Sequence, residues 1–399
     1  MGKYPPWVVL AYLNGNNELA PEISAAQYDI EETTPGIDTE ILLQIGRLDK
    51  NIVKILRPNE KTDEKDSWHG VRLYHISRAA SSLKGELANL NMADPKSLYN
   101  FIEWGMQNYP AEHYMLILSG HSCEYIGMMN DYSQDKPYIM GIPEIALVLE
   151  YIKKNLGRSI DLLIFDTCLF NNIELLYEFG QSPDPAVKTI LTYRDNAPAG
   201  GLSYNEILKS MDYEGENLNS FIQNLINNSS KDLIAYNINQ TSLDNIKKLF
   251  DNLARKYLEE TEKSKKDLLV SMKTAEPEKP GQEILNEIIN FISSLIIHKK
   301  TPFKHPAEQI RILDKYIPNK NTAAFYYRLA FARDNAWSNL LCRKLPESNF
   351  QLTISIGFSP LILAPSKIKA LIASSNPNLA TKDVDNILKD LILAKKWHV

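Results

Sequence analysis

The stretch DLLIFDTCLFNNIELLYEFG, residues 161–180, decides the predicted fold, because it joins an apolar run to a helix-like segment. The apolar run ends at Asp166, and Cys168 follows two residues later. A second apolar run, YMLILSGHS at residues 114–122, ends in the same way at His121. Short apolar runs bounded by small or polar residues are typical of buried strands in a parallel sheet. We therefore predict an α/β fold with a mostly parallel sheet, in which both runs are central strands.

The ends of these two strands would bring a thiol and an imidazole together, because functional groups gather at the carboxyl ends of parallel strands. We expect the chain to turn into a helix directly after Cys168, where the first N–H groups and the helix dipole would favour the thiolate. His121 could then hold or deliver a proton, which is the layout of a thiol acyl-transfer site. The plainer interpretation makes Cys168 a small buried apolar side chain and His121 a hydrogen-bonded loop residue.

The rest of the first half alternates strand-like and helix-like segments. Helices are predicted by apolar spacing and by prolines at their first turns, at residues 20–32, 94–106 and 143–155. Strands are predicted at residues 7–13, 40–48, 51–56, 71–76 and 188–193, with the second and third paired to each other. His69 precedes the strand at 71–76 instead of following one, so we interpret it as a loop residue.

The second half has a different pattern, with apolar residues at helical spacing from residue 214 to about residue 343. A strand returning to the sheet is predicted at residues 352–358, and a helical pair follows from residue 366 to the end. The sequence therefore suggests three parts. They are a core at 1–213, a helical insertion or subdomain at 214–345, and a return strand with C-terminal helices at 346–399.

Composition narrows the functional classes. The net charge of −5 argues against a nucleic-acid or membrane partner. Three cysteines, Cys123, Cys168 and Cys342, are too few for a disulfide framework, and no Cys/His spacing suggests a metal site. The apolar run near the start has the length of a strand, not of a signal peptide or a membrane span. We expect a cytoplasmic protein as the chain stands, and a secreted one if a leader has been removed.

Several blocks of the sequence match a known family in the same order. The matching blocks are residues 7–19 (WVVLAYLNGNNEL), 91–95 (NMADP), 114–121, 131–133, 142–149, 166–169 with Glu174, 200–204 (GGLSY) and 352–360. With these blocks the chain resembles the bacterial clostripain-like cysteine peptidases, relatives of the caspases, legumain, gingipains and separase. The resemblance implies a caspase-like three-layer α/β/α sandwich, in which residues 1–213 form the catalytic core and the second half is helical.

The resemblance also implies roles for individual residues. Cys168 matches the family's nucleophile, and His121 matches the residue that protonates the leaving amine. The family's oxyanion hole combines the N–H of the cysteine with an N–H just after the histidine, which here belongs to Ser122. Relatives carry Gly-x-Gly where this chain has Ser122-Cys123-Glu124, so a loop that needs positive φ would be strained here. Cys123 could also approach Cys168 closely enough for a reversible disulfide.

The family cleaves peptides and proteins after Arg or Lys, and an acidic residue two positions before the nucleophile lines the specificity pocket. Asp166 has that position, and its carboxylate could pair with a guanidinium or an ammonium group. Asp195 is a looser candidate for a second pocket acid. An alternative role for Asp166 is to cap the helix that follows.

Maturation and cofactors complete the expectations. Relatives often mature by cleavage after a basic residue, for which Lys136 is the candidate, but Pro137 makes that bond a poor peptidase substrate. No cofactor is required by the sequence. Some relatives depend on calcium, so calcium is kept as a candidate, although the chain has no D-x-D-x-D-G loop.

Three functions remain open at this point. The first is a cysteine endopeptidase for Arg or Lys bonds that uses a Cys-His dyad. The second is a catalytically silent caspase-like scaffold that binds a peptide or a protein partner, suggested by the missing glycines after His121. The third is an amidase or transpeptidase with the same thiol chemistry.

Overall fold

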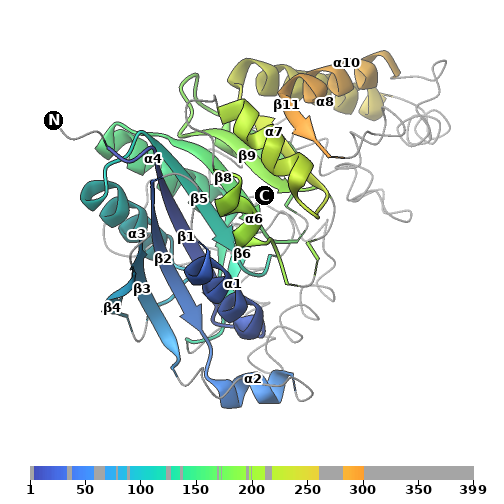
Figure 1. The fold of residues 1–399 in the computed structure, drawn as a ribbon. Coiled ribbons are helices and arrows are strands. Elements are labelled where there is room, and N and C mark those ends of the chain that lie inside the picture. Colours follow the sequence, from blue (N-terminus) through green and yellow to red (C-terminus); the bar gives the residue numbers. More distant parts are fainter. Residues whose placement is uncertain are drawn as a thin grey trace.

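The structure is a computed structural model that describes residues 4–33, 38–57, 68–77, 80–87, 90–122, 127–134, 138–168, 170–171, 173–194, 197–198, 200–211, 218–259 and 282–300. In this part of the chain a nine-stranded sheet has the order β11-β10-β9-β8-β5-β1-β2-β3-β4 (Figure 1). Its strands are β1 (Trp7–Gly15), β2 (Thr39–Arg47), β3 (Gly70–Ile76), β4 (Ser81–Glu86), β5 (His113–Ser119), β8 (Ile160–Asp166), β9 (Val187–Tyr193), β10 (Leu233–Asn237) and β11 (Ile296–Lys299). A separate hairpin pairs β6 (Gly127–Asp131) with β7 (Tyr138–Gly141).

The centre of the sheet is parallel. Strands β9, β8, β5, β1 and β2 pair in parallel, whereas the outer strands on both sides pair antiparallel. All residues of β1 and β8 are buried, which explains why the two strands are apolar without alternation. The prediction that the runs at 114–122 and 161–166 form central parallel strands is confirmed.

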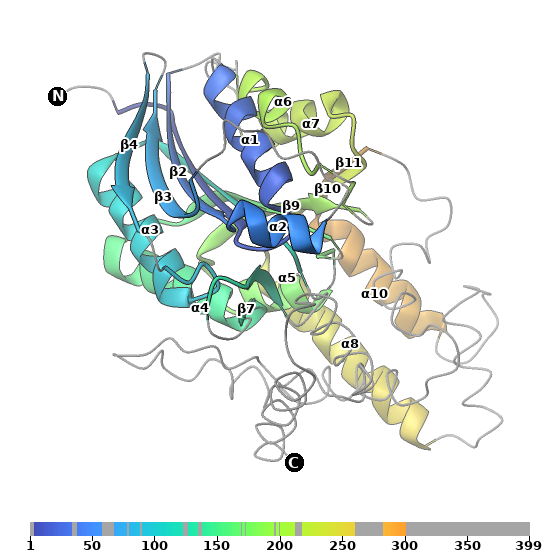
Figure 2. The ribbon, with the colours of Figure 1, turned by 90° about the horizontal axis from the view of Figure 1, so that it is seen from below.

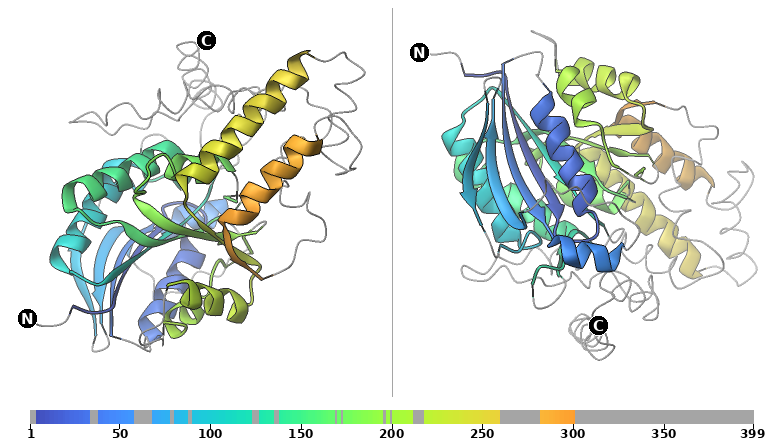
Figure 3. Two further views of the ribbon diagram at one scale, coloured as in Figure 1. Left: turned by 90° about the horizontal axis from the view of Figure 1, so that it is seen from above. Right: turned by 60° about the horizontal axis from the view of Figure 1, so that its bottom comes forward.

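Helices cover both faces of the sheet, which makes a three-layer α/β/α sandwich (Figure 2). On one face, α1 (Ala20–Glu32), α6 (Tyr204–Lys209) and α7 (Leu218–Asn228) pack on alternate strand residues such as Val9, Ile117 and Ile164. The other face is covered by α3 (Pro95–Asn108), α4 (Ile142–Leu156), α5 (Ile173–Phe179), α8 (Gln240–Glu259) and α10 (Gln282–Leu295). Figure 3 shows α8 and α10 beside each other at the β11 end of the sheet. The predicted fold class is confirmed.

Sequence patterns located several helices well. Helix α1 begins and ends where the apolar spacing predicts. Both α3 and α4 carry proline in the first turn, where the missing N–H group costs no helical hydrogen bond. The Asp94 carboxylate also caps α3 by accepting from the Lys96 N–H at 2.9 Å.

Three assignments made from the sequence are wrong. Residues 51–56 belong to helix α2 (Lys50–Leu56) and not to a strand, because Asp49 caps the backbone at Asn51 and the short apolar run also fits a helical period. The true antiparallel partner of β2 is β3. Strands β10 and β11 lie in the range predicted to be helical, and both join the main sheet. The helix expected directly after Cys168 begins only at Ile173.

The division of the chain into three parts stays a prediction. The expected strand at 352–358 and the helical pair from 366 lie outside the described residues. Within those residues, no helix is both long enough and apolar enough to cross a membrane.

A buried carboxyl group in α5 makes stability depend on pH. Glu178 is 3% exposed, and burial, together with the charges of Glu144 and Glu150, raises its pKa to about 8. The folded protein therefore holds this proton at pH values where the unfolded chain, with a pKa near 4.5, has released it. The free energy of unfolding should consequently fall as the pH rises from about 4.5 to about 8.

We expect Glu178→Gln to remove this pH dependence, because the amide never carries a charge. The variant should be more stable than the wild type at pH 8, and the two should converge toward pH 4.5, with roughly 1.4 kcal/mol for each pKa unit of the shift. Urea unfolding at a series of pH values measures the difference. Exposed Glu112→Gln is the control, and an unchanged pH slope in Glu178→Gln would show that the carboxyl reaches water in solution.

Candidate active site

The pairing of β5 with β8 brings His121 and Cys168 to the same edge of the sheet. Ser119 lies opposite Asp166 in the parallel register, and each candidate residue follows its strand by two positions. Both side chains line one pocket of about 450 Å³. The pocket is lined by Glu18, Leu19, Glu22, Ile23, Ala26, Arg57, Ser119, Gly120, His121, Asp166, Thr167, Cys168, Ala197, Pro198, Gly200, Gly201 and Tyr204.

The turn that carries Cys168 is fixed to the end of β5 by two hydroxyl groups. Thr167 Oγ1 donates to the Gly120 carbonyl at 2.7 Å, and Ser122 Oγ donates to the Cys168 carbonyl. The Cys168 side chain is partly exposed, and its Sγ lies 3.9 Å from the carbonyl oxygen of Ala197. Helix α5 begins five residues after Cys168 and not, as we expected, directly after it.

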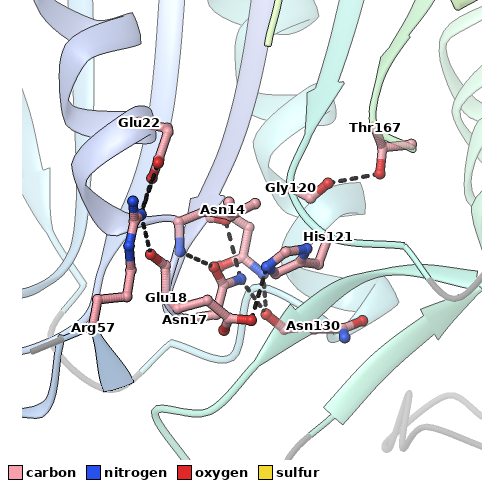
Figure 4. A network of polar contacts seen from close by, with 10 residues as sticks. Asn14, Asn17, Glu18, Glu22, Arg57, Gly120, His121, Asn130 and Thr167 are labelled. Carbon is pink, nitrogen blue, oxygen red and sulfur yellow. Dashed lines mark hydrogen bonds and ion pairs between the residues drawn. The ribbon is translucent and has the colours of Figure 1, made fainter. Parts of the chain in front are cut away.

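His121 contacts an acidic residue that sequence analysis did not assign to the site. Its Nε2 lies 3.0 Å from Oε1 of Glu18, in the loop between β1 and α1 (Figure 4). The His121 carbonyl accepts from the Met129 N–H of β6 at 2.8 Å, which fixes the backbone of this residue. Glu18 belongs to the block at 7–19, so the resemblance located the loop, but nothing in the sequence pairs it with His121.

A buried polar network joins this loop to β6. Asn14 and Asn17 both donate to the Asn130 carbonyl, at 3.1 and 2.7 Å (Figure 4). Asn16 donates to the Asp131 carboxylate at 2.8 Å. All three asparagines are fully buried. The network therefore fixes the loop that carries Glu18 relative to β6, the strand whose Met129 N–H donates to the His121 carbonyl.

Asp166 lines the pocket but is 6% exposed. Its carboxylate accepts from the Tyr193 hydroxyl at 2.6 Å, the Ser119 hydroxyl at 2.9 Å, the Tyr204 hydroxyl at 3.0 Å and the Leu202 N–H at 3.0 Å. Burial raises the pKa of the Asp166 carboxyl, and these donors oppose the rise. The alternative role as a helix cap is wrong, because the helix begins at Ile173 and the carboxylate bonds elsewhere.

The remaining predicted residues have varied placements. Ser122 does not line the pocket, and its backbone avoids the positive φ that we expected to strain this loop. His69 precedes β3 with 64% of its side chain exposed, as expected for a loop residue. Asp195, Cys123 and Lys136 lie outside the described residues.

No metal site is evident in the described part of the chain. No group of three or more His, Cys, Asp or Glu side chains gathers there closely enough to hold an ion. Calcium as a cofactor stays a prediction.

The chain that places a thiol and an imidazole at neighbouring strand ends has relatives among known proteins. The model of the Peptidase_C11 clostripain family matches residues 72–341. The chain therefore belongs to the clostripain family of cysteine peptidases, as the sequence blocks indicated.

One curated relative is clostripain from Hathewaya histolytica, 26% identical over 196 residues. This match spans 43% of the present chain and only 35% of clostripain, so the chain corresponds to about a third of that relative's length.

Two solved structures share the fold. A secreted C11 cysteine protease from Bacteroides thetaiotaomicron, bound to an irreversible peptide inhibitor, aligns with a TM-score of 0.51 and 14% identity, covering 74% of this chain and 85% of that one. An inactive zymogen C11 protease from Parabacteroides distasonis aligns with a TM-score of 0.52 and 14% identity, covering 82% and 99%. At these identities the likeness establishes the fold alone.

We expect Asp131→Asn to destabilise the protein, because this carboxylate accepts from Met92 N–H, Asn16, and both the N–H and the hydroxyl of Ser133. The NH₂ group of an asparagine would face some of these donors in place of an acceptor oxygen. Each buried donor left unpaired costs about 1–3 kcal/mol. Urea unfolding at pH 7 measures the loss. The control is Asp184→Asn, whose side chain is 86% exposed and whose ion pair should contribute less than about 1 kcal/mol. Equal stability of the two variants would contradict the prediction.

Proposed function

We propose that this protein is a cysteine endopeptidase that cleaves after Arg or Lys, with Cys168 as nucleophile and His121 as general acid. The observation that carries the proposal is the shared pocket at the ends of β5 and β8, to which both residues contribute. Membership in a family of cysteine peptidases makes thiol chemistry the natural use of that pocket. Its substrates would be peptides or proteins with an accessible basic residue.

The reaction would proceed through an acyl-enzyme. The thiol of Cys168 adds to the carbonyl carbon of the scissile amide, and its proton passes to His121. The C–N bond then breaks as His121 protonates the leaving amine, which departs and leaves a thioester. Water adds to the thioester, the carboxylic acid product leaves, and the thiol is restored.

The developing oxyanion would be stabilised by the backbone N–H groups of Cys168 and Ser122. Ser122 bridges to Met128 in antiparallel fashion, and the Met129 N–H donates to the His121 carbonyl. In that arrangement Ser122 and Met128 form a non-hydrogen-bonded pair, whose N–H groups point away from each other. The Ser122 N–H is therefore not used in the pairing with β6, which leaves it available as a donor.

The charge around the pocket supports a preference for basic residues. Among the described residues, three acidic ones line it, Glu18, Glu22 and Asp166, and Arg57 also lines it with a positive charge. Arg57 is engaged by Glu22, with Nη1 2.7 Å from each carboxylate oxygen. The Asp166 carboxylate already accepts hydrogen bonds, so we propose that it attracts the basic group mainly by its charge and by the shape of the wall it supports.

Gly201 is part of that wall. It has a φ of +67°, and a Cβ at this position would lie 2.9 Å from Asp166 Oδ2. Only glycine fits here without displacing the carboxylate. The GGLSY block thus closes over Asp166, and Leu202 and Tyr204 from the same block donate to it.

We expect the purified protein to hydrolyse reporter amides that end in Arg or Lys, and Cys168→Ala to abolish this turnover. The assay is run with calcium and with a chelator, and an Arg-directed chloromethyl ketone should label the wild type alone. Peptide binding without labelling or turnover would favour the silent scaffold. Transfer of the acyl group to an added amine in preference to water would favour a transpeptidase.

We expect Asp166→Asn to weaken selection for positive charge. The variant keeps the size of the side chain, and three of the four donors to Asp166 are hydroxyl groups, which can turn to accept from an amide. The preference for an Arg reporter over its neutral citrulline analogue should therefore fall about 10- to 100-fold in kcat/KM, in line with the loss of one negative charge beside the pocket. Steady-state kinetics with both reporters measure the ratio. The exposed Asp184→Asn variant should keep the wild-type ratio, and an unchanged ratio in Asp166→Asn would assign specificity to other acids.

A further inference from the structure

The pocket contains a carboxylate, that of Glu18, to which neither the sequence nor the family match assigns a role. We propose that Glu18 is a positioning residue for His121: it accepts the Nε2–H, selects that tautomer, and leaves Nδ1 to carry the proton to the leaving amine. This inference rests on the proposed function of His121 and adds the group that orients it.

The first support is the geometry of the pair. Nε2 of His121 and Oε1 of Glu18 are 3.0 Å apart, and the two side chains are 31% and 28% exposed. The N–H direction is not aligned with the carboxylate, so Nε2 and Glu18 Oε2 both lack a hydrogen-bond partner within the described residues. Hydrogen bonds of catalytic groups are often misaligned in a free enzyme and tighten when substrate binds. A rotation of the imidazole would complete the hydrogen bond between His121 Nε2–H and the Glu18 carboxylate.

The second support is the way both partners are held. Arg57 Nη1 donates to the Glu18 carbonyl at 3.0 Å, and Asn17 Oδ1 accepts from the Leu19 N–H at 2.8 Å. Asn17 in turn bonds to β6, the same strand that donates to the His121 carbonyl. The backbones that carry Glu18 and His121 are thus both hydrogen-bonded to β6, although the two residues lie far apart in sequence. Such fixed backbones are what a positioned carboxylate-imidazole pair requires.

The third support is charge. Besides Glu18, the ionisable groups among the described residues that line the pocket with His121 are Glu22, Arg57, Asp166, Cys168 and Tyr204. Glu22 is bound by Arg57, and Asp166 accepts from donors of its own. Glu18 is the carboxylate that contacts the ring. Its negative charge would hold the ring in the orientation in which the other nitrogen faces the leaving amine.

A purely structural role for Glu18 makes a different prediction. Loss of packing or of loop order would lower every activity of the pocket in parallel. Loss of a positioned proton donor should instead harm amide hydrolysis selectively, because an amine must be protonated to leave, whereas a nitrophenolate leaves without a proton. The ratio of amide to ester turnover therefore separates the two roles.

The test compares Glu18→Gln with the wild type on an Arg nitroanilide and on the matching Arg nitrophenyl ester. We expect kcat for the amide to fall about 10- to 100-fold, with KM and ester turnover changed less than about 3-fold. The same substitution added to His121→Ala should have no further effect, since Glu18 acts through the ring. Equal losses on amide and ester, or additive losses in the double variant, would overturn the proposal.

The matched control is Glu40→Gln. Glu40 also pairs with a histidine, His75, and both side chains are similarly half-buried, but the pair lies on β2 and β3 and does not line the pocket. This variant should keep the wild-type ratio of amide to ester turnover.

A second measurement does not depend on turnover. Nitrogen-15 spectra of histidine-labelled protein report the tautomer of His121, which should be Nε2–H in the wild type and a mixture in Glu18→Gln. If the wild type shows no turnover that depends on Cys168, the proposed function fails, and the spectra still decide the role of Glu18. An identical His121 tautomer in both proteins would overturn the inference.

Discussion

The parallel pairing of β5 with β8 is the constraint on which the candidate site depends. Because Ser119 lies opposite Asp166, the residues that follow the two strands emerge side by side. A slip of one residue would turn the side chains of one strand to the other face of the sheet. It would separate the imidazole from the thiol and would also break the hydrogen bond between Ser119 and Asp166. The same ladder that builds the core therefore aligns the site.

The residues around the pocket include buried polar groups, and each of these groups needs a hydrogen-bond partner. Asp131 and Asp166 each accept several hydrogen bonds from residues remote in the chain, and burial raises the pKa of both carboxyls. A buried acceptor is tolerable only when its donors are present, since an unpaired polar group costs about 1–3 kcal/mol. The β1 loop, the β6 strand and the GGLSY block are thus mutually dependent.

The sequence was a good guide wherever a segment is long or capped. Helix α1 and the strand β8 have the patterns that their burial requires, and they were predicted correctly. The sequence pattern was misleading at residues 51–56, because six residues fit the period of a strand as well as that of a helix. The cap at Asp49 favours the helix that the structure shows. Strand β10 was missed for a different reason, because its five residues lie between helices and acquire their role only by pairing with β9.

What the sequence by itself determined is the set of chemically useful residues. Apolar runs that end at Asp166 and His121 indicate strand ends, and such local patterns need no knowledge of distant contacts. Only the tertiary structure decided the partners: that Glu18 contacts His121, and that Tyr193 and Tyr204 bond to Asp166. These contacts join residues that are tens of positions apart, and their geometry depends on sheet register and loop packing, which no local pattern encodes.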